Sequence, residues 1–416
     1  MAEPKVRFKR DDGSEYPVWR LVPFKKLSFP TGIRNKNDAD LESYSISNEK
    51  GFTPQSDQFE DAGYLASADR SLYYIVSPGS FVYNPARINI GSIGYQNVGK
   101  DVLVSSLYEI FNTTEDLDDE FLLNWFRTKQ FQRNVRRFSE GGVRQYFYYD
   151  KLCMVNFPLP CLEEQHKIAN FLLSVDDVIY NSEQEAANLE IQKKAVMKKI
   201  FSQEVRFKRD DGTEFPEWEE QSFENVFEPL NNNTLSRDML NYDFGPALNI
   251  HYGDILVKYG DVCDVQVYKV PFVNEGINVS KYAHLKDGDI IIADTAEDEA
   301  VGKAIEIINV GDLVVVSGLH TMACRPKQKY SPKYLGYYIN STVFHDQLKP
   351  YMQGIKVTSI GRKNIKDVSI MYPSSLEEQR LIADFLSDFD EAITAAKKEL
   401  ELWKELKKGL LQQMFV

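Results

Sequence analysis

The sequence has no long apolar run and few cysteines. No stretch of 18 or more apolar residues occurs, and no apolar run follows the charged N-terminal segment MAEPKVRFKRDDG. We therefore expect neither a membrane anchor nor a signal peptide. The four cysteines have no CxxC spacing and no histidine cluster nearby: Cys153, Cys161, Cys263 and Cys324. This pattern argues against a disulfide framework or a zinc site and is typical of the reducing cytoplasm.

Complete catalytic motifs are also missing. The segment Asn84–Arg87 (NPAR) lacks the second proline and the aromatic residue with which adenine methyltransferases hold a flipped base. Gly94–Lys100 fits GxxxxGK, but Asp101 follows where a phosphate loop needs Ser or Thr, and the next segment predicts a strand. The five histidines have no HExxH spacing. We therefore expect no catalytic residue.

An acidic turn at residues 294–298 is the best candidate for a metal site. Asp294, Glu297 and Asp298 supply carboxylates that could bind a cation, but an exposed acidic turn is the simpler interpretation. We expect no metal and no cofactor in this chain.

The charge balance does not favour nucleic acid over the whole chain. The formal net charge is −13. However, residues 121–151 hold seven Lys and Arg against two acids. Since salt screens charges beyond about 8–10 Å, a local basic strip can still attract phosphate in an acidic molecule.

The sequence is two copies of one plan. Residues 5–19 (KVRFKRDDGSEYPVW) match residues 204–218 (EVRFKRDDGTEFPEW) at eleven of fifteen positions, with an offset of 199. LEEQHKIANFLLSVDDVI from Leu162 matches LEEQRLIADFLSDFDEAI from Leu376 at ten of eighteen, with an offset of 214. Such long periods indicate duplicated domains rather than a solenoid. Phe415 aligns with Phe201, and the residues expected after it stand at Val6–Lys9, so we expect the N-terminal segment to dock beside the C-terminal helix.

A long helix is predicted after each LEEQ marker. Ser375 and Glu378 have capping-box spacing, and Pro160 precedes the first marker where a helix start tolerates it. The apolar seam positions are Ile179, Ser182, Ala186, Leu189, Val196 and Ile200 in one copy, and Ile393, Ala396, Leu400, Trp403, Leu410 and Met414 in the other. Both seams are interrupted by a lysine, Lys193 and Lys407. The shared pattern predicts an antiparallel coiled coil, although two helices that each pack on their own domain would also fit.

The helix length suggests a spacer. The 28 residues Asp176–Gln203 would make a rod of about 42 Å, and one turn of B-DNA is about 34–36 Å. Such a rod could hold two DNA-binding domains about one turn apart.

Residues 20–157 and 219–371 are predicted to be mixed and strand-rich. Turn signals separate β-formers in YIVSPGSFVYNPARINIGSIGYQ, and HYGDILVKYGDV and HLKDGDIIIADTAED alternate in the same way. Each half closes with a helical pattern, LDDEFLLNWFRTKQFQRNVRRF or SPKYLGYYINSTVFHDQLKPYM, followed by a glycine turn at Gly141-Gly142 or Gly354. The expected class is α+β.

At this point the sequence resembles the specificity subunits of type I restriction–modification systems. The resemblance rests on the two LEEQ-x-x-IA-x-FL helix starts, the helix ends KKIF and QQMF, and the segments FVYNPARINIGSIG and EGGVRQYFYYDKLCMVNFPLP. It implies two β-rich target recognition domains separated by long antiparallel coiled-coil helices, in a pseudo-twofold circular arrangement. The expected boundaries are 1–157 and 204–371 for the recognition domains, and 158–203 and 372–416 for the helical regions. The second half has no copy of YNPARIN, which predicts a different recognition subtype there.

The resemblance also implies a function. Each recognition domain would read one half of a bipartite, non-palindromic site in double-stranded DNA, and the helical region would bind two methyltransferase subunits. Two nuclease-translocase subunits would join for restriction. S-adenosylmethionine, ATP and magnesium are expected only in the partner subunits, and the assembly is expected in the cytoplasm of a bacterium or archaeon.

The candidate DNA-binding residues lie near the glycine turns and in the basic strip. Arginine can bind phosphate as a charge or guanine as a bidentate donor, and Asn or Gln can pair with adenine. We expect Arg136 and Arg137 to position the backbone, and Arg144 and Gln145 to reach base edges. The full set is Arg87, Asn89, Arg133, Arg136, Arg137, Arg144 and Gln145 in the first half, and Lys356, Thr358, Ser359, Arg362 and Lys363 in the second. Each could instead be an ordinary solvated side chain, and Arg87 and Asn89 could be structural.

Two other functions fit parts of the sequence. An acidic DNA mimic that blocks restriction would suit the net charge, but here the acids share helices with lysines. A coiled-coil adaptor would suit the long helices, but it does not account for duplicated domains with a basic strip.

Overall fold

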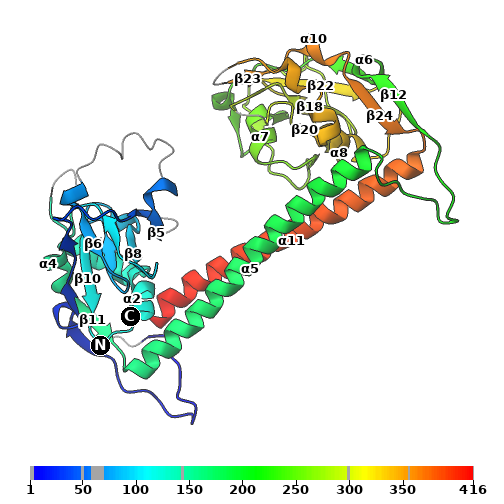
Figure 1. The fold of residues 1–416 in the computed structure, drawn as a ribbon. Helices are drawn as coiled ribbons and strands as arrows, with labels where there is room; N and C mark the ends of the chain where they lie inside the picture. The colour runs from blue at the N-terminus through cyan, green and yellow to red at the C-terminus, as the bar shows by residue number, and fades with distance from the viewer. Residues whose placement is uncertain are drawn as a thin grey trace. The chain divides into compact units, whose positions relative to one another are not determined.

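The computed structural model describes residues 4–47, 51–57, 70–141, 145–297, 300–354 and 357–415. The chain forms two compact units, Met1–Glu183 with Lys398–Val416, and Gln184–Lys397. The boundary crosses the two long helices α5 (Leu162–Phe201) and α11 (Leu376–Met414). Each unit therefore consists of one β-rich head and a segment of both helices, as the colours of Figure 1 show along the chain.

The first head is built on two main sheets and an aromatic core. The sheets have the orders β3-β6-β9-β4-β5 and β2-β10-β7-β8, and β1 pairs with β11. Phe81 and Phe111 stack with their ring centroids 5.0 Å apart at the centre of this core. The elements are β1 (Arg20–Pro23), β2 (Ser28–Pro30), β3 (Ile33–Arg34), β4 (Ser43–Ser47), β5 (Gly51–Pro54), β6 (Tyr74–Val76), β7 (Phe81–Tyr83), β8 (Ile93–Tyr95), β9 (Val102–Val104), β10 (Glu109–Thr113), α2 (Asp119–Phe126), α3 (Lys129–Phe138), α4 (Tyr149–Cys153) and β11 (Asn156–Leu159).

The second head has a larger sheet core. A five-stranded sheet runs β13-β22-β18-β20-β16 and a four-stranded sheet runs β14-β17-β15-β21, while β12 pairs with β24 and β19 with β23. The central strand β18 is wholly buried because both of its faces are covered. The elements are β12 (Trp218–Ser222), α6 (Phe223–Val226), β13 (Phe227–Leu230), β14 (Leu240–Asn241), β15 (Leu248–Ile250), α7 (Tyr252–Val257), β16 (Val262–Asp264), β17 (Phe272–Val273), β18 (Ile290–Ala293), β19 (Thr295–Ala296), β20 (Ala304–Ile308), β21 (Val315–Ser317), β22 (Thr321–Pro326), α8 (Tyr334–Asn340), α9 (Thr342–His345), β23 (Thr358–Ser359), α10 (Arg362–Ile365) and β24 (Ser369–Pro373).

Within each unit, α5 and α11 run antiparallel. In the first unit Asp176 pairs with Lys407, and Glu183 with Lys404 at 2.9 Å. In the second unit Glu190 pairs with Lys397 at 2.6 Å, and Lys193 with Asp390 at 2.5 Å. The repeat offset of 214 relates Asp176 to Asp390 and Lys193 to Lys407, so these two ion pairs are equivalent. It also relates Glu183 to Lys397 and Glu190 to Lys404. The repeat is therefore visible in the ion pairs as well as in the sequence, and the predicted antiparallel helices and α+β class are confirmed.

The predicted interhelix positions lie on the less exposed faces of the helices. Four side chains are buried: Ala186, Ile200, Ile393 and Met414. Six are half-buried: Ile179, Leu189, Val196, Leu400, Trp403 and Leu410. Ile200 and Met414 belong to the apolar cores of the heads, so the helix ends anchor the heads as well as facing the other helix.

The two repeated markers contact each other, which explains why they recur together. In the first unit the carboxylate of Glu164 accepts hydrogen bonds from Arg7 at 2.8 and 3.0 Å and from the indole N–H of Trp19 at 3.1 Å. In the second unit Glu378 accepts in the same way from Arg206 and Trp218. The role of Glu378 thus differs from the predicted helix cap, because its carboxylate binds another segment.

The predicted docking of the N-terminal segment is confirmed. The amide of Val6 donates to the carbonyl of Gln413 at 3.1 Å, and the amide of Val205 donates to Lys199 at 3.2 Å in the equivalent place. Phe415 packs in the first core, with its ring 4.9 Å from that of Phe121. In the first unit, non-covalent contacts hold the N-terminal segment against the end of α11. In the second unit, the continuous chain links the equivalent segment to the end of α5.

Three predictions about local structure need correction. The long helices start at their LEEQ markers as predicted, but the predicted rod over residues 176–203 is too short, because α5 has 40 residues and a length of about 60 Å, not 42 Å. The segment predicted to alternate as a strand from His251 forms helix α7 instead, because the imidazole of His251 caps it by accepting from the amide of Gly253. Both predicted helical patterns break in two, the first into α2 and α3 because Thr128 caps a new helix, and the second into α8 and α9 because Ser341 does. Within the described ranges, no helix combines the length and the apolarity needed to cross a bilayer.

Candidate nucleic-acid interface

Each head carries a small hairpin at its glycine turn. Glu140 and Tyr146 exchange two backbone hydrogen bonds of 2.9 and 2.7 Å, and Gln353 and Ser359 exchange two of 3.1 and 2.9 Å. The residue after the first bridge position is a glycine in both cases, Gly141 with φ 114° and Gly354 with φ 128°. A side chain is strained at these φ values, and a Cβ on Gly354 would lie 1.9 Å from the carbonyl oxygen of Val357. The described starts of the two glycine turns, a bridge residue followed by a glycine with positive φ, are thus alike.

The hairpins occupy equivalent places in the chain. The first follows α3 and leads through α4 and β11 into α5, and the second follows α9 and leads through α10 and β24 into α11. Of the predicted contact residues, Arg144 and Lys356 lie outside the described residues. The described residues on either side of them, which form the two bridges, are equivalent in the two heads.

Helix α3 presents a row of arginines beside the first hairpin. Its apolar side chains Phe131 and Val135 are buried, whereas Arg133, Arg136 and Arg137 are exposed. Arg133 donates to a backbone carbonyl, and Arg137 lies over the ring of Phe138. Among the described residues none of the three arginines forms an ion pair with a carboxylate. Their charges are therefore available to phosphates.

The turn around Asn84 adjoins the same hairpin. The amide of Phe147 donates to the carbonyl of Pro85 at 2.9 Å, which joins the two segments. The turn is formed by the Asn84 side chain, which accepts from the amide of Ala86. Arg87 and Asn89 are both exposed, and no hydrogen bond of either side chain to another described residue is present. The structure thus brings Arg87, α3 and the hairpin to one region of the first head.

An aromatic pair that sequence reasoning missed lies next to Gln145. The rings of Tyr146 and Tyr148 stack with centroids 5.6 Å apart and planes 4° apart. Tyr148 is 42% exposed, whereas Phe147 between them is fully buried. The alternation in YFYY could have indicated this, because side chains two apart in an extended segment share a face.

The second hairpin has different chemistry. Thr358 and Ser359 form β23, which pairs with β19, and Ser359 is exposed. The guanidinium of Arg362 donates to Asn232 Oδ1 at 2.9 Å and to the carbonyl of Thr321 at 3.3 Å. Arg362 therefore braces the head, while Lys363 is exposed without an ion pair among the described residues.

A histidine near this hairpin was also missed. His320 Nδ1 lies 3.3 Å from the hydroxyl of Thr295 and 3.4 Å from the carboxylate of Asp294. Thr295 is the β19 residue that faces Ser359. His320 is therefore a hydrogen-bonding group beside the second hairpin.

The rejected catalytic motifs have ordinary structural roles. In the segment that resembles a phosphate loop, the Gln96 amide donates to the carbonyls of Val76 and Lys100, and strand β9 follows. Among the described residues no group of three or more His, Cys, Asp or Glu side chains could hold a metal ion; Asp298 lies outside them. Asp294 and Glu297 are within them, and Asp294 accepts from Thr295.

Comparisons with known proteins agree with this architecture. The family described as "Type I restriction modification DNA specificity domain" matches residues 48–191 and 217–402, more than half of the chain. The chain is 25% identical over 339 residues to the type I restriction enzyme MjaVIII specificity subunit of Methanocaldococcus jannaschii, covering 75% of this chain and 73% of that one. It is 23% identical over 430 residues to the putative type I restriction enzyme MjaX specificity subunit of the same organism, covering 97% and 94%.

Two solved structures share the fold. One, from work on complex assembly and conformational transition of the type I R-M system, has a TM-score of 0.60 at 17% identity and covers 95% of this chain and 97% of that chain. The other, the type I restriction-modification system S subunit from M. genitalium, has a TM-score of 0.52 at 13% identity and covers 100% and 99%. The duplicated heads, the long helices and the family match over most of the sequence together show that the chain belongs to the type I restriction–modification specificity subunits.

Proposed function

We propose that each head reads one half of a bipartite, non-palindromic DNA site. The observation that carries this proposal is the pair of equivalent hairpins, which present unlike exposed residues on the same framework. The first surface has exposed arginines and stacked tyrosines, and the second has hydroxyl groups, a lysine and a histidine. Because base edges differ in their donor and acceptor patterns, unlike surfaces would select unlike words.

We propose that the long helices bind the two methyltransferase subunits. Large apolar side chains are exposed on them, among them Tyr180 at 61%, Ile191 at 65% and Leu402 at 57%. Apolar groups of this size exposed on a helix are typical of a surface that a partner covers.

The chemistry would belong to the partners. As a member of its family the chain is a non-catalytic DNA-recognition subunit, and the methyltransferase would supply S-adenosylmethionine and modify adenine. ATP and magnesium would act in the two nuclease-translocase subunits, and the complex would work in the cytoplasm.

The helices would also fix the gap between the half-sites. At a length of about 60 Å each, they exceed one turn of B-DNA, about 34–36 Å. A stiff spacer of this kind favours one gap length over its neighbours.

The test is selection of DNA from a random library by the complex of this chain with its methyltransferase. We expect one two-part word with a fixed gap, bound with a steep dependence on salt. Recovery of one short uninterrupted word, or of no word, would contradict the proposal. Binding of the complex to no DNA at all, together with inhibition of a heterologous restriction complex, would instead support the DNA-mimic alternative.

A further inference from the structure

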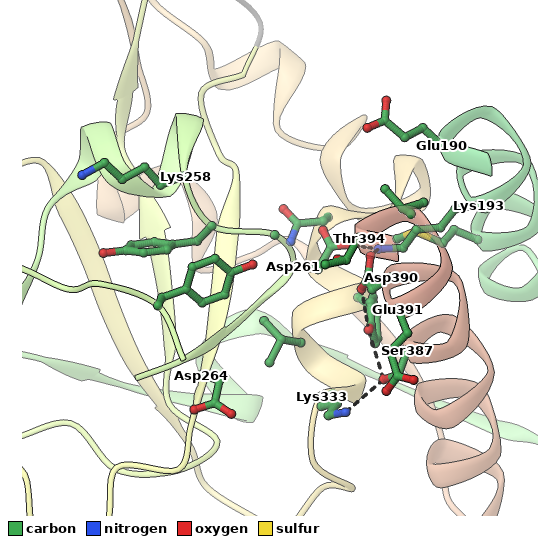
Figure 2. Close-up of a pocket in the computed structure, with 18 of the residues that line it drawn as sticks. Glu190, Lys193, Lys258, Asp261, Asp264, Lys333, Ser387, Asp390, Glu391 and Thr394 are labelled. Carbon is green, nitrogen blue, oxygen red and sulfur yellow. Dashed lines mark hydrogen bonds and ion pairs between the residues drawn. The ribbon is translucent and has the colours of Figure 1, made fainter. Parts of the chain in front are cut away.

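The second unit contains a charged cleft where its head meets α5 and α11. The cleft has a volume of about 760 Å³, and Figure 2 shows side chains from the head and from both helices in it. At its base, Lys193 Nζ lies 2.6 Å from the carboxylate of Asp261 and 2.5 Å from that of Asp390. Lys193 is one of the two lysines that interrupt the apolar seam, and only 8% of it is exposed. This lysine therefore joins three segments.

The backbone of Asp261, the residue that the head contributes to this network, is tightly packed. The backbone carbonyl of Asp261 accepts from the amide of Glu306 at 3.1 Å. Helix α8 packs so closely here that a Cβ on Gly336 would lie 2.5 Å from the same carbonyl oxygen. The backbone at Asp261 is thus held against both a strand and a helix of the head, and its side chain is left to pair with Lys193.

A tyrosine completes the connection to α11. Tyr337 on α8 donates its hydroxyl proton to Asp390 at 2.7 Å, and its ring centroid lies 4.8 Å from Lys193 Nζ. Ser387 of α11 lies 3.2 Å from the same hydroxyl and accepts from Lys333 at 3.2 Å. The dashed lines of Figure 2 follow these contacts from the head to the helix.

The charges are strongly coupled. Burial opposes the charge on Lys193, but the carboxylates of Asp261 and Asp390 outweigh it and raise the pKa of the lysine. Burial raises the pKa of Asp261, and the nearby lysine only partly offsets this effect. Removing one member would leave a partly buried charge without its partner, which is costly.

The equivalent place in the first unit is built differently. Lys407 pairs there with Asp176, the counterparts of Lys193 and Asp390. The first head contributes a cation, since Arg127 lies 3.7 Å from Asp176. Burial and Arg127 lower the pKa of Lys407, although Asp176 opposes this shift. The helices are alike, but a carboxylate joins one head to them and a guanidinium joins the other.

We propose that Asp261, Lys193 and Asp390 form a positioning joint that fixes the second head on the helix pair and so sets the gap length that the complex accepts. This inference rests on the proposed reading of a two-part site. One additional base pair in the gap rotates a half-site by about 34–36° and moves it by about 3.4 Å. With a rigid joint, binding to a site with the wrong gap is costly. With a loosened joint, the second head can follow the displaced half-site.

The test uses Asp261→Asn in the complex with the methyltransferase. The DNA library carries the two half-site words selected by the wild type, with the gap varied one base pair at a time. We expect the wild type to prefer its gap over the neighbouring lengths by about tenfold or more, and the variant by about threefold or less, at unchanged words. Glu391→Gln is the matched control, because Glu391 lines the same cleft, is exposed and has no ion pair among the described residues; it should keep the wild-type preference.

The outcomes are distinct. Unchanged words with an unchanged gap preference in Asp261→Asn would overturn the inference while leaving the proposed function intact. A wild-type complex that selects no two-part word would overturn both. If Asp261→Asn does not fold, Asp390→Asn tests the same joint from the helix side, and Asp261→Glu should restore the narrow gap preference.

Discussion

At the scale of single residues, buried carboxylates bind segments that lie far apart in the sequence. Glu378 is almost fully buried, and it binds both the guanidinium of Arg206 and the indole of Trp218. We expect Glu378→Gln to lower the free energy of unfolding of the second unit by about 3 kcal/mol, because a charged partner is lost while Arg206 stays largely buried. Thermal unfolding should show the midpoint of this unit falling by about 6–10 °C.

The neighbouring residue provides the control. Glu377→Gln changes the same charge at an exposed position of the same helix turn, so its midpoint should stay within about 1–2 °C of the wild type. Equal losses in both variants would show that the charge of the helix start, and not the buried contact, is responsible.

A second buried carboxylate makes stability depend on pH. Glu306 accepts from the backbone amides of Lys333 and Gly336, and burial raises its pKa to about 7. Because the folded state holds this proton more tightly than the unfolded state, the contribution of Glu306 falls as the pH rises from about 4.5 to 7 and is constant above and below.

Glu306→Gln should remove this contribution. Relative to the wild type, the variant should gain about 3 kcal/mol of stability between pH 4.5 and pH 8, since 2.5 pKa units correspond to that free energy. Urea unfolding of both proteins across this range measures the difference. A difference that does not change with pH would mean that Glu306 titrates normally.

Residue roles were the hardest feature to predict from the sequence. The repeat identified Glu164 and Glu378 as equivalent, and charge identified the arginines of α3. However, nothing in the sequence placed Arg7 near Glu164, because contacts over 157 residues depend on the tertiary fold. The sequence also did not reveal that the guanidinium of Arg362, a predicted DNA contact, donates to Asn232 and to the carbonyl of Thr321 within the head.

At the scale of elements, we predict that the basic helix α3 and the hairpin of the first head make different kinds of DNA contact. Arg136→Gln should weaken binding to all sequences about equally and reduce the slope of log K against log salt by about 1, because one phosphate contact is lost. Gln145→Ala should instead relax the choice at one position of one half-site, by a factor corresponding to about 1–3 kcal/mol. Binding titrations at several salt concentrations, with matched and mismatched sites, separate the two effects. A uniform loss in both variants would contradict the division.

Elements were predictable where the local pattern was strong. The long helices follow from a heptad repeat without proline, and β18 follows from an apolar run between turns. Helix α7 was missed because a histidine side chain caps it, and histidine is not among the usual capping residues. The break at Thr128 was missed because neither glycine nor proline marks it, and the new helix starts from the side-chain cap of Thr128.

At the scale of the whole molecule, the duplication makes the position of the chain ends interchangeable. The amide of Val6 bonds to Gln413 as that of Val205 bonds to Lys199, so the first unit lacks only a covalent link. A permuted chain that joins Phe415 to Val6 through a copy of residues 202–204, and opens at Gln203, should therefore fold. Closing so short a loop costs little, and we expect a thermal midpoint within about 5 °C of the wild type.

DNA selection is a stricter test of the permuted chain than its thermal stability. The permuted chain, in complex with the methyltransferase, should select the same two words as the wild type. A control that opens the chain inside α5 at Ala186, a buried helix residue, should lose both stability and DNA selection, since it interrupts the helix that both heads share. If opening at Gln203 were equally damaging, the covalent link after Phe201 would be doing more than the non-covalent contacts that replace it in the first unit.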